Sequence, residues 1–436
     1  MEIVFEIDNH KVFDSFSVAS IFNRFYCSIA SKLVSRLPSP SGIFHTSSDA
    51  FKQHYSRLIG TRSGFVISPV SSHFFRKQLS TLNPKKAVGL DDVSSLFLRD
   101  AANSVLVPIT HIINLSITTE TVPSAFKEAR VVPLFKMGSK LDPSNYRPVS
   151  ILCVLSKILE RAVNTQLNEY LEKRGLLFEN QSGFRNGYST DSCLIGLTDY
   201  VKSEMSRGNL VGMVLIDLCK AFDTVDHSIL IEKLRAIGVS STAWFESYMM
   251  DRKQCVQVDS VFSDPLAVSC GVPQSSILGP QLFLIYINDM NISLNCKLSL
   301  YADDSALLYS HSDASVIGDF LSRELSKCKQ WLVDNELSLH IGKTEYLLFG
   351  TSRRLRGCDF RVTCEGKAIE RVFNVKYLGV QLDEYLNGSS HVNHVLKTCA
   401  ARLAFLYRSA NLLSYTCRLT LCSALVQPYI DYCCSS

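Results

Sequence analysis

Two adjacent aspartates, Asp303 and Asp304, stand between two apolar runs in the segment KLSLYADDSALLYS, residues 297–310. Both runs have the alternation and the residue types of β-strands, so we expect a hairpin with the acids at its turn. Two neighbouring carboxylates repel each other by about 1 kcal/mol in water and by several at a less polar site. A divalent cation or exposure to solvent would offset that repulsion, and Asp is also a common turn residue. The pair alone therefore leaves a metal site and an ordinary turn both open.

A third carboxylate, Asp217, ends the apolar run VGMVLID, residues 211–217. A continuous run of this length is typical of a central strand that is buried on both faces. Asp303 lies 86 residues further along the chain, which is enough for the intervening elements to return beside that strand. Carboxylates gathered there supply the oxygen ligands that Mg²⁺ takes, and water and substrate phosphates complete its coordination. Because two such ions stabilise the attacking and leaving oxygens of a phosphoryl transfer, the three acids indicate a nucleotidyl-transfer site.

The composition is that of a globular chain that buries a large core. Of its 436 residues, 46% are hydrophobic and 20% are charged, a length that corresponds to two or three domains. The net charge of +4 gives no strong preference for polyanions, so contact with nucleic acid has to come from local patches. The 15 cysteines are an odd number without zinc spacing, which indicates reduced thiols in an intracellular protein. The N-terminus lacks the signal-peptide pattern and the apolar runs are too short to cross a bilayer, so we expect no membrane partner.

Helical and strand-like segments interleave along the chain, which favours an α+β or α/β core. Apolar residues at helical spacing predict a helix within residues 1–37, and a Pro/Ser-rich segment follows it. Residues 151–174 are typical of a long amphipathic helix that Gly175 ends. The basic loop SRRLRG, residues 352–357, either touches phosphates or is a solvated surface loop.

Eight segments resemble, in order, the motifs of the reverse transcriptases of non-LTR (LINE-type) retrotransposons of the jockey-like kind, from about Lys85 to Asp383. The segments are KKAVGLDDV, VVPLFKMGSKLDPSNYRPVSILCVLSKILER, NQSGFRNGYST, LIDLCKAFDTVDH, GVPQSSILGP, YADD, WLVDNELSLHIGKTEYLLF and KYLGVQLD. The resemblance implies an α+β fold shaped like a right hand, with fingers, an antiparallel-sheet palm and a partial helical thumb. We expect a helical extension and linker over residues 1–83, fingers over 84–210, the palm with the metal site and primer-grip hairpin over 211–385, and a truncated thumb over 386–436.

The same resemblance implies an RNA-directed DNA polymerase that extends a DNA 3′ end on an RNA template. Its substrates would be deoxynucleoside triphosphates, its cofactor two Mg²⁺ ions that Mn²⁺ can replace, and its primer a nicked chromosomal target. We expect it to act in the nucleus and cytoplasm, as part of a longer parent protein that carries the missing endonuclease.

The resemblance also implies a role for residues that match the metal and catalytic motifs. Asp217, Asp303, Asp304 and the backbone carbonyl of Leu218 would bind the metal ions. Lys343 would protonate the leaving pyrophosphate as a general acid.

Other matching residues imply contacts with the nucleotide and the nucleic acid. Phe222 would be the aromatic gate that rejects a ribose 2′-hydroxyl, and Gln274 would lie near the template and the incoming nucleotide. Lys136 and Arg147 would hold the triphosphate, Arg147 through a bidentate fork. The residues that would contact template or primer are Asn180, Gln181, Phe184, Arg185, Tyr377, Leu378 and Gly379.

One position departs from the family pattern, because Ser275 stands where the loop motif usually has a second glycine. If the backbone there needs a positive φ or a close approach to the template, serine costs about 1 kcal/mol or more and reduces activity. Asp223 superficially fits a viral RNA-dependent RNA polymerase, but Phe222 and the YADD and GVPQ motifs favour deoxynucleotides. A group II intron maturase is a closer relative than a viral RNA polymerase, but the motif NQSGFRNGYST counts against it. A catalytically silent retrotransposon-derived fragment that only binds RNA remains the alternative of another class.

Overall fold

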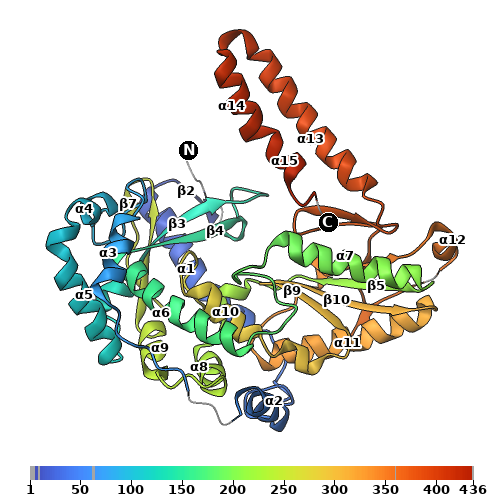
Figure 1. The fold of residues 1–436 in the computed structure, drawn as a ribbon, viewed down its shortest axis with the longest axis horizontal. Coiled ribbons are helices and arrows are strands. Elements are labelled where there is room, and N and C mark those ends of the chain that lie inside the picture. Colours follow the sequence, from blue (N-terminus) through green and yellow to red (C-terminus); the bar gives the residue numbers. More distant parts are fainter. Residues whose placement is uncertain (1–4, 8–9, 61–63, 359, 435–436) are drawn as a thin grey trace. The chain divides into compact units, whose positions relative to one another are not determined.

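Strands and helices alternate along the chain and form two compact units, which are described one at a time (Figure 1). The computed structural model describes residues 5–7, 10–60, 64–358 and 360–434. The first unit comprises Met1–Phe178, Cys219–Ile292 and Gln330–Ser338, and the second comprises Glu179–Leu218, Ser293–Lys329 and Leu339–Ser436. The fold is therefore a mixed α+β structure, as expected from the interleaved segments. The predicted limits of the fingers, palm and thumb come from the family resemblance and not from these two units, so they stay a prediction.

The second unit is built on a five-stranded sheet in the order β14-β11-β5-β10-β9. The strands are β14 Glu370–Arg371, β11 Glu345–Phe349, β5 Leu210–Ile216, β10 Asp304–His311 and β9 Lys297–Tyr301. All neighbours are antiparallel except β11 and β14. β5 takes the central position because it is apolar along its whole length and can be covered on both faces.

Helices α7, Thr190–Ser206, and α11, Ala314–Asp334, cover the two faces of this sheet (Figure 1). Leu194 and Leu197 of α7 pack with Val211 and Met213, which point to one face of β5. Gly212 points to the other face, where a Cβ atom would lie 2.4 Å from a methyl of Ile317 on α11. A side chain at residue 212 would therefore push α11 off the sheet.

Small elements and a helical hairpin complete the second unit. β15 Asn374–Tyr377 and β16 Val380–Asp383 form a hairpin, as do β12 Thr363–Cys364 and β13 Lys367–Ala368. α12 is a short helix over Ser352–Leu355. The helices α13 Ser389–Arg408, α14 Tyr415–Leu425 and α15 Gln427–Asp431 pack against one another through Leu406 and Val426.

The first unit contains a second sheet in the order β4-β3-β6-β7, with β8 also paired to β6. Its strands are β3 Glu128–Phe135, β4 Tyr146–Leu152, β6 Arg252–Val258, β7 Val261–Phe262 and β8 Leu266–Val268, and β1 Phe5–Ile7 pairs with β2 His10–Val12 apart from them. Its helices are α1 Ser15–Val34, α2 Asp49–Ile59, α3 Ser72–Ser80, α4 Ser95–Asp100, α5 Ala102–Thr118, α6 Val154–Arg174, α8 His227–Ala236, α9 Thr242–Met249 and α10 Gly279–Ile287.

The predicted N-terminal helix is α1, and it packs on the sheet of the first unit. Phe22 of α1 lies edge-on to Tyr146 of β4, with ring centroids 4.9 Å apart. The Asn23 side chain donates to the backbone carbonyls of Gln254 and Asp264. The predicted long helix is α6, which ends at Gly175 in a left-handed conformation with φ 60°. In the described part of the chain, no helix combines the length and apolarity needed to cross a membrane.

Candidate functional site

The predicted carboxylate hairpin is present, and its register brings it to the end of β5. Ser305 pairs with Ile216, the last residue of β5, and Asp304 and Asp217 are the residues next to this pair on the two chain segments. Asp303 and Asp304 are exposed, and the Asp217 side chain is 46% exposed. The carboxylates therefore meet water and ligands at one end of the central strand.

A buried glutamine holds the backbone of this hairpin turn. The Gln181 side chain accepts hydrogen bonds from the backbone N–H of Ala302 (3.0 Å) and of Gly183 (2.8 Å). Asn180 and Ser182 bond Leu300 of β9 through their backbones, as an added strand would. A Cβ atom on Gly183 would lie only 2.4 Å from the Ala302 nitrogen, so only glycine fits there. The segment after α6 thus supports the metal hairpin, a positioning role that the sequence did not reveal for Gln181.

The other predicted template residues follow in the same segment. Phe184 is 55% exposed and has a φ of +55°. Arg185 donates to the Gln181 carbonyl, and its guanidinium lies 4.3 Å from the centre of the Tyr188 ring. The Phe184 ring is thus exposed, and Arg185 is held against its own segment; contact of either with the template stays a prediction.

Lys343, the predicted general acid, lies beside the carboxylate of β5. Its Nζ atom is 3.9 Å from an Asp217 carboxylate oxygen, and both side chains are well exposed, at 66% and 46%. An ion pair of that length and exposure contributes less than about 1 kcal/mol to stability. The Asp217 carbonyl accepts from the His340 N–H, and Leu218 forms a bridge with Leu339, which seats the Lys343 loop against the end of β5.

The donor chemistry at the end of β5 fits Mg²⁺ through a pair of carboxylates. Among the residues that the structure describes, no group of three or more His, Cys, Asp or Glu side chains is arranged to hold a metal ion. Mg²⁺ takes one or two carboxylates, and water and phosphates complete its octahedron. Asp217, Asp303, Asp304 and the Leu218 carbonyl would hold it, and the bridging of Asp217 to Asp303 by one ion stays a prediction.

The predicted primer-grip residues form the tip of the β15–β16 hairpin. Tyr377 pairs with Val380, and the two residues between them, Leu378 and Gly379, have φ values of 45° and 87°. Two consecutive positive φ angles are typical of a tight hairpin turn. The Tyr432 hydroxyl donates to the Leu378 carbonyl at 2.8 Å. Tyr377 itself is buried, which raises the pKa of its hydroxyl, so only the turn residues are at the tip.

The predicted nucleotide-binding cations lie in the first unit on the β3–β4 hairpin. Lys136 follows β3 and its N–H donates to the Asn145 carbonyl, and Arg147 pairs with Leu134. Both side chains are exposed. Tyr146, next to Arg147, packs between Phe22 and Phe135 and so fixes the base of the hairpin.

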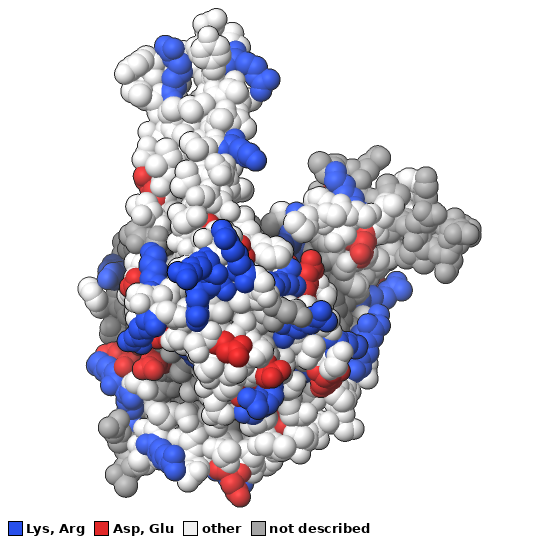
Figure 2. Space-filling view, turned by 90° about the vertical axis from the view of Figure 1, so that its right-hand side faces the viewer, with Lys and Arg blue, Asp and Glu red and all other residues white. Residues whose placement is uncertain are grey.

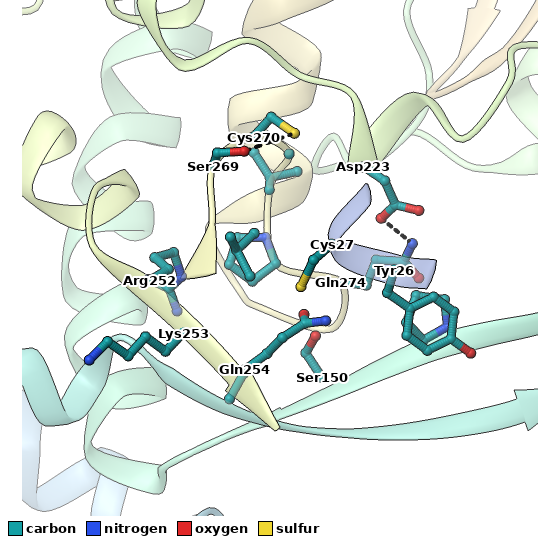
Figure 3. A pocket seen from close by; sticks show the side chains of 16 residues that line it. Tyr26, Cys27, Ser150, Asp223, Arg252, Lys253, Gln254, Ser269, Cys270 and Gln274 are labelled. Carbon is teal, nitrogen blue, oxygen red and sulfur yellow. Dashed lines mark hydrogen bonds between the residues drawn. The ribbon is translucent and has the colours of Figure 1, made fainter. Parts of the chain in front are cut away.

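Phe222 and Gln274 are also in the first unit, on the segments after β5 and β8. The Phe222 ring stacks on Phe283 of α10, with centroids 4.2 Å apart and an interplanar angle of 22°. The Gln274 amide donates to an Asp223 carboxylate oxygen at 2.7 Å (Figure 3). Burial raises the pKa of Asp223, while the Gln274 hydrogen bond and the charges of Lys220 and Arg147 act in the opposite direction.

From the sequence, Asp223 bears only on the viral RNA-dependent RNA polymerase alternative, and its hydrogen bond with Gln274 was not foreseen. Its carboxyl oxygen accepts from the Gln274 amide N–H, which leaves the amide oxygen of Gln274 on the side away from that hydrogen bond. A cavity of about 70 Å³ lies behind this pair, and Tyr26 and Cys27 of α1 contribute to its wall (Figure 3).

Ser275 adopts the conformation that the glycine of the family pattern would favour. Its φ is +73°, in a turn closed by a hydrogen bond from the Ser276 N–H to the Pro273 carbonyl. The turn is anchored from below by Glu160 of α6, whose carboxylate accepts from the Ile277 N–H at 2.6 Å and from the Tyr248 hydroxyl at 2.8 Å. Glu160 is buried, which raises its pKa. Sequence reasoning missed Glu160 because it lies inside a helical pattern.

Residues 136–382, more than half of the chain, match the family described as reverse transcriptase (RNA-dependent DNA polymerase). The chain belongs to this family. It is 29% identical over 351 residues to the probable RNA-directed DNA polymerase from transposon BS of Drosophila melanogaster, covering 77% of this chain and 38% of that protein.

Two further relatives give the same result. The RNA-directed DNA polymerase from mobile element jockey of Drosophila funebris is 27% identical, over 84% of this chain and 41% of its own length. The probable RNA-directed DNA polymerase from transposon X-element of Drosophila melanogaster is 28% identical, over 80% and 39%. The chain spans about two fifths of the length of these relatives.

Proposed function

We propose that this chain is the RNA-directed DNA polymerase part of a non-LTR retrotransposon protein, which extends a DNA 3′ end on an RNA template. The observation that carries the proposal is the register of β5 and β10, whose last pair, Ser305 with Ile216, adjoins Asp304 and Asp217 in a chain of the reverse transcriptase family. The family relationship does not favour the alternative of a silent fragment that only binds RNA.

The proposed reaction is an in-line attack of the primer 3′ oxygen on the α-phosphate of a deoxynucleoside triphosphate. When bound, two Mg²⁺ ions, or Mn²⁺ in their place, supply charge neutralisation and activation of that oxygen. Asp217, Asp303 and Asp304 orient the reacting groups through their oxygens. Lys343 gives its proton to the leaving pyrophosphate, a role that its 3.9 Å separation from Asp217 supports.

The nucleotide is proposed to bind through residues of the first unit. Lys136 and Arg147 take the triphosphate oxygens, and their exposure on one hairpin supports this role. Phe222, backed by Phe283, rejects a 2′-hydroxyl by steric contact. Gln274, oriented by Asp223, faces the base pair that forms. The template and primer contacts proposed for the second unit are Asn180, Phe184, Arg185, Leu378 and Gly379. Gln181 and Tyr377, whose side chains are buried, are proposed to position these segments. A nicked chromosomal primer, an endonuclease on a longer parent and work in the nucleus and cytoplasm stay predictions.

Primer extension tests this proposal. The purified chain is given a DNA primer on poly(rA) with dTTP and Mg²⁺ or Mn²⁺, beside Asp303→Ala and the matched control Asp319→Ala, an exposed acid on α11. We expect extension by the wild type and by Asp319→Ala, and none by Asp303→Ala. Equal activity of wild type and Asp303→Ala would refute the polymerase, and equal use of UTP would refute the gate assigned to Phe222.

A further inference from the structure

Three arginines gather around α12 in the second unit, in the segment 352–356. Arg353, Arg354 and Arg356 are all exposed. Within the described residues, none of the ion pairs involves any of the three. Figure 2 faces the end of the molecule where α12 lies, and Lys and Arg side chains cluster there. The positive charge of this segment is therefore available to a partner.

This cluster is at the opposite end of the sheet from the carboxylates. α12 follows the last residue of β11, and Leu355 approaches Gly350, as does Leu210, the first residue of β5. The Arg354 guanidinium donates to the carbonyl of Ser312, just after β10, at 2.8 Å. The seven residues of β5 separate this end from Asp217 by roughly 23 Å, at about 3.3 Å per residue.

Two exposed aromatic rings lie on loops joined to the same end of the sheet. Phe373 is 61% exposed, and the guanidinium of Arg371 lies 5.2 Å from the centre of its ring. The Glu384 N–H donates to the Phe373 carbonyl, and the Glu384 carbonyl accepts from the Gly350 N–H, which joins this loop to the end of β11.

Tyr385 is the second ring of this surface, at 43% exposed. Its pKa is raised mainly by the hydrogen bond with Glu384, and the nearby charge of Arg356 acts in the opposite direction. The carboxylates of Glu384 and Asp383 thus lie near Tyr385, and the three arginines outnumber them.

We propose that Arg353, Arg354, Arg356, Phe373 and Tyr385, together the α12 surface, bind single-stranded RNA outside the polymerase site. Arginines neutralise phosphates, and exposed aromatic rings stack on unpaired bases, which a duplex keeps inside its stack. That the strand is the RNA being copied rests on the proposed function, whereas binding to the α12 surface does not.

Direct binding tests the α12 surface in the Asp303→Ala background, so that synthesis plays no part in the readout. Arg353→Gln/Arg356→Gln removes two charges and keeps Arg354, which bonds the Ser312 carbonyl. Affinity for a labelled single-stranded RNA is measured by fluorescence anisotropy over a range of salt. We expect several-fold weaker binding and a slope of log K against log[salt] that is shallower by about 1.4, at 0.7 for each lost phosphate contact. Phe373→Ala is expected to weaken binding roughly tenfold with the slope unchanged.

The matched control is Lys52→Gln/Arg57→Gln, which removes the same charge from exposed positions on α2 in the first unit. An equal loss in the control, or an unchanged affinity and slope in the α12 variant, overturns the proposal. So does an equal loss for duplex RNA, and tighter binding of single-stranded DNA overturns the assignment to RNA. Absence of primer extension by the wild type would refute the polymerase while leaving this result intact.

Discussion

Replacing Ser275 with glycine should stabilise the first unit. At φ +73° an L-residue pays a steric penalty of about 1–2 kcal/mol that glycine does not. Glycine also makes the unfolded chain more flexible, which lowers the free energy of unfolding by about 0.4–1 kcal/mol. The Ser275 side chain is exposed, so little packing is lost. We therefore expect Ser275→Gly to raise the free energy of unfolding by about 0.5–1 kcal/mol.

Urea unfolding followed by tryptophan fluorescence measures this change. The two tryptophans of the chain, Trp244 and Trp331, are both buried in the first unit, so their emission reports on the unit that contains Ser275. With an m-value of about 3 kcal/mol/M, the midpoint should rise by roughly 0.2–0.3 M urea.

Two variants separate the backbone effect from loss of the hydroxyl. Ser275→Ala keeps the Cβ atom, so its midpoint should stay near that of the wild type. Ser276→Gly should lower the midpoint, because the buried Ser276 hydroxyl accepts from the Gly279 N–H at 2.8 Å. The reasoning fails if Ser275→Gly leaves the midpoint unchanged or lowers it, or if Ser275→Ala gives the same gain.

Three further changes have expected outcomes. Phe222→Val removes the ring that stacks on Phe283, so the ratio of kcat/KM for ribonucleotides to kcat/KM for deoxynucleotides should rise by about 10- to 200-fold. An unchanged ratio in single-nucleotide incorporation would argue against the gate. Lys343→Gln should lower kcat about 10²–10⁴-fold while the free energy of unfolding stays within about 1 kcal/mol of the wild type, because the ion pair with Asp217 is exposed; a normal kcat would exclude the general acid. Burial raises the pKa of Asp223 above its ordinary 3.8, so the free energy of unfolding of the wild type falls as pH rises from 3.8 to the raised value. Asparagine does not titrate, so Asp223→Asn should become more stable relative to the wild type over that range of pH. A stability difference that is flat with pH in urea titrations would contradict this assignment.

Several elements were predictable because they depend on local patterns. The alternating segment around Asp303 and Asp304 is the β9–β10 hairpin, and the apolar run before Asp217 is β5, displaced by one residue. Period and turn residues determine such elements from near neighbours along the chain. The positive φ of Ser275 was also foreseeable, because a missing glycine marks a backbone that needs one.

The supports of the candidate site were not predictable in this way. Gln181 was predicted to face the template, and the structure buries its side chain against the Ala302 turn, 121 residues away. The sequence likewise contains no sign that Glu160 anchors Ile277, 117 residues later. Both contacts depend on how helices and strands pack, and a polar residue in a helical pattern has the same appearance whether it faces solvent or a loop.

By itself, the sequence determined which chemistry is available, because the acids, their spacing and the family motifs are present in the linear order of the chain. Only the tertiary structure decided which of those groups meet, through the register that pairs Ser305 with Ile216 beside Asp304 and Asp217, and through the hydrogen bond between Asp223 and Gln274. The physical reason is that strand register and side-chain burial depend on how a whole face of a sheet packs against a helix, as β5 packs against α11 at Gly212. The energy of that packing comes from residues that are far apart in the chain.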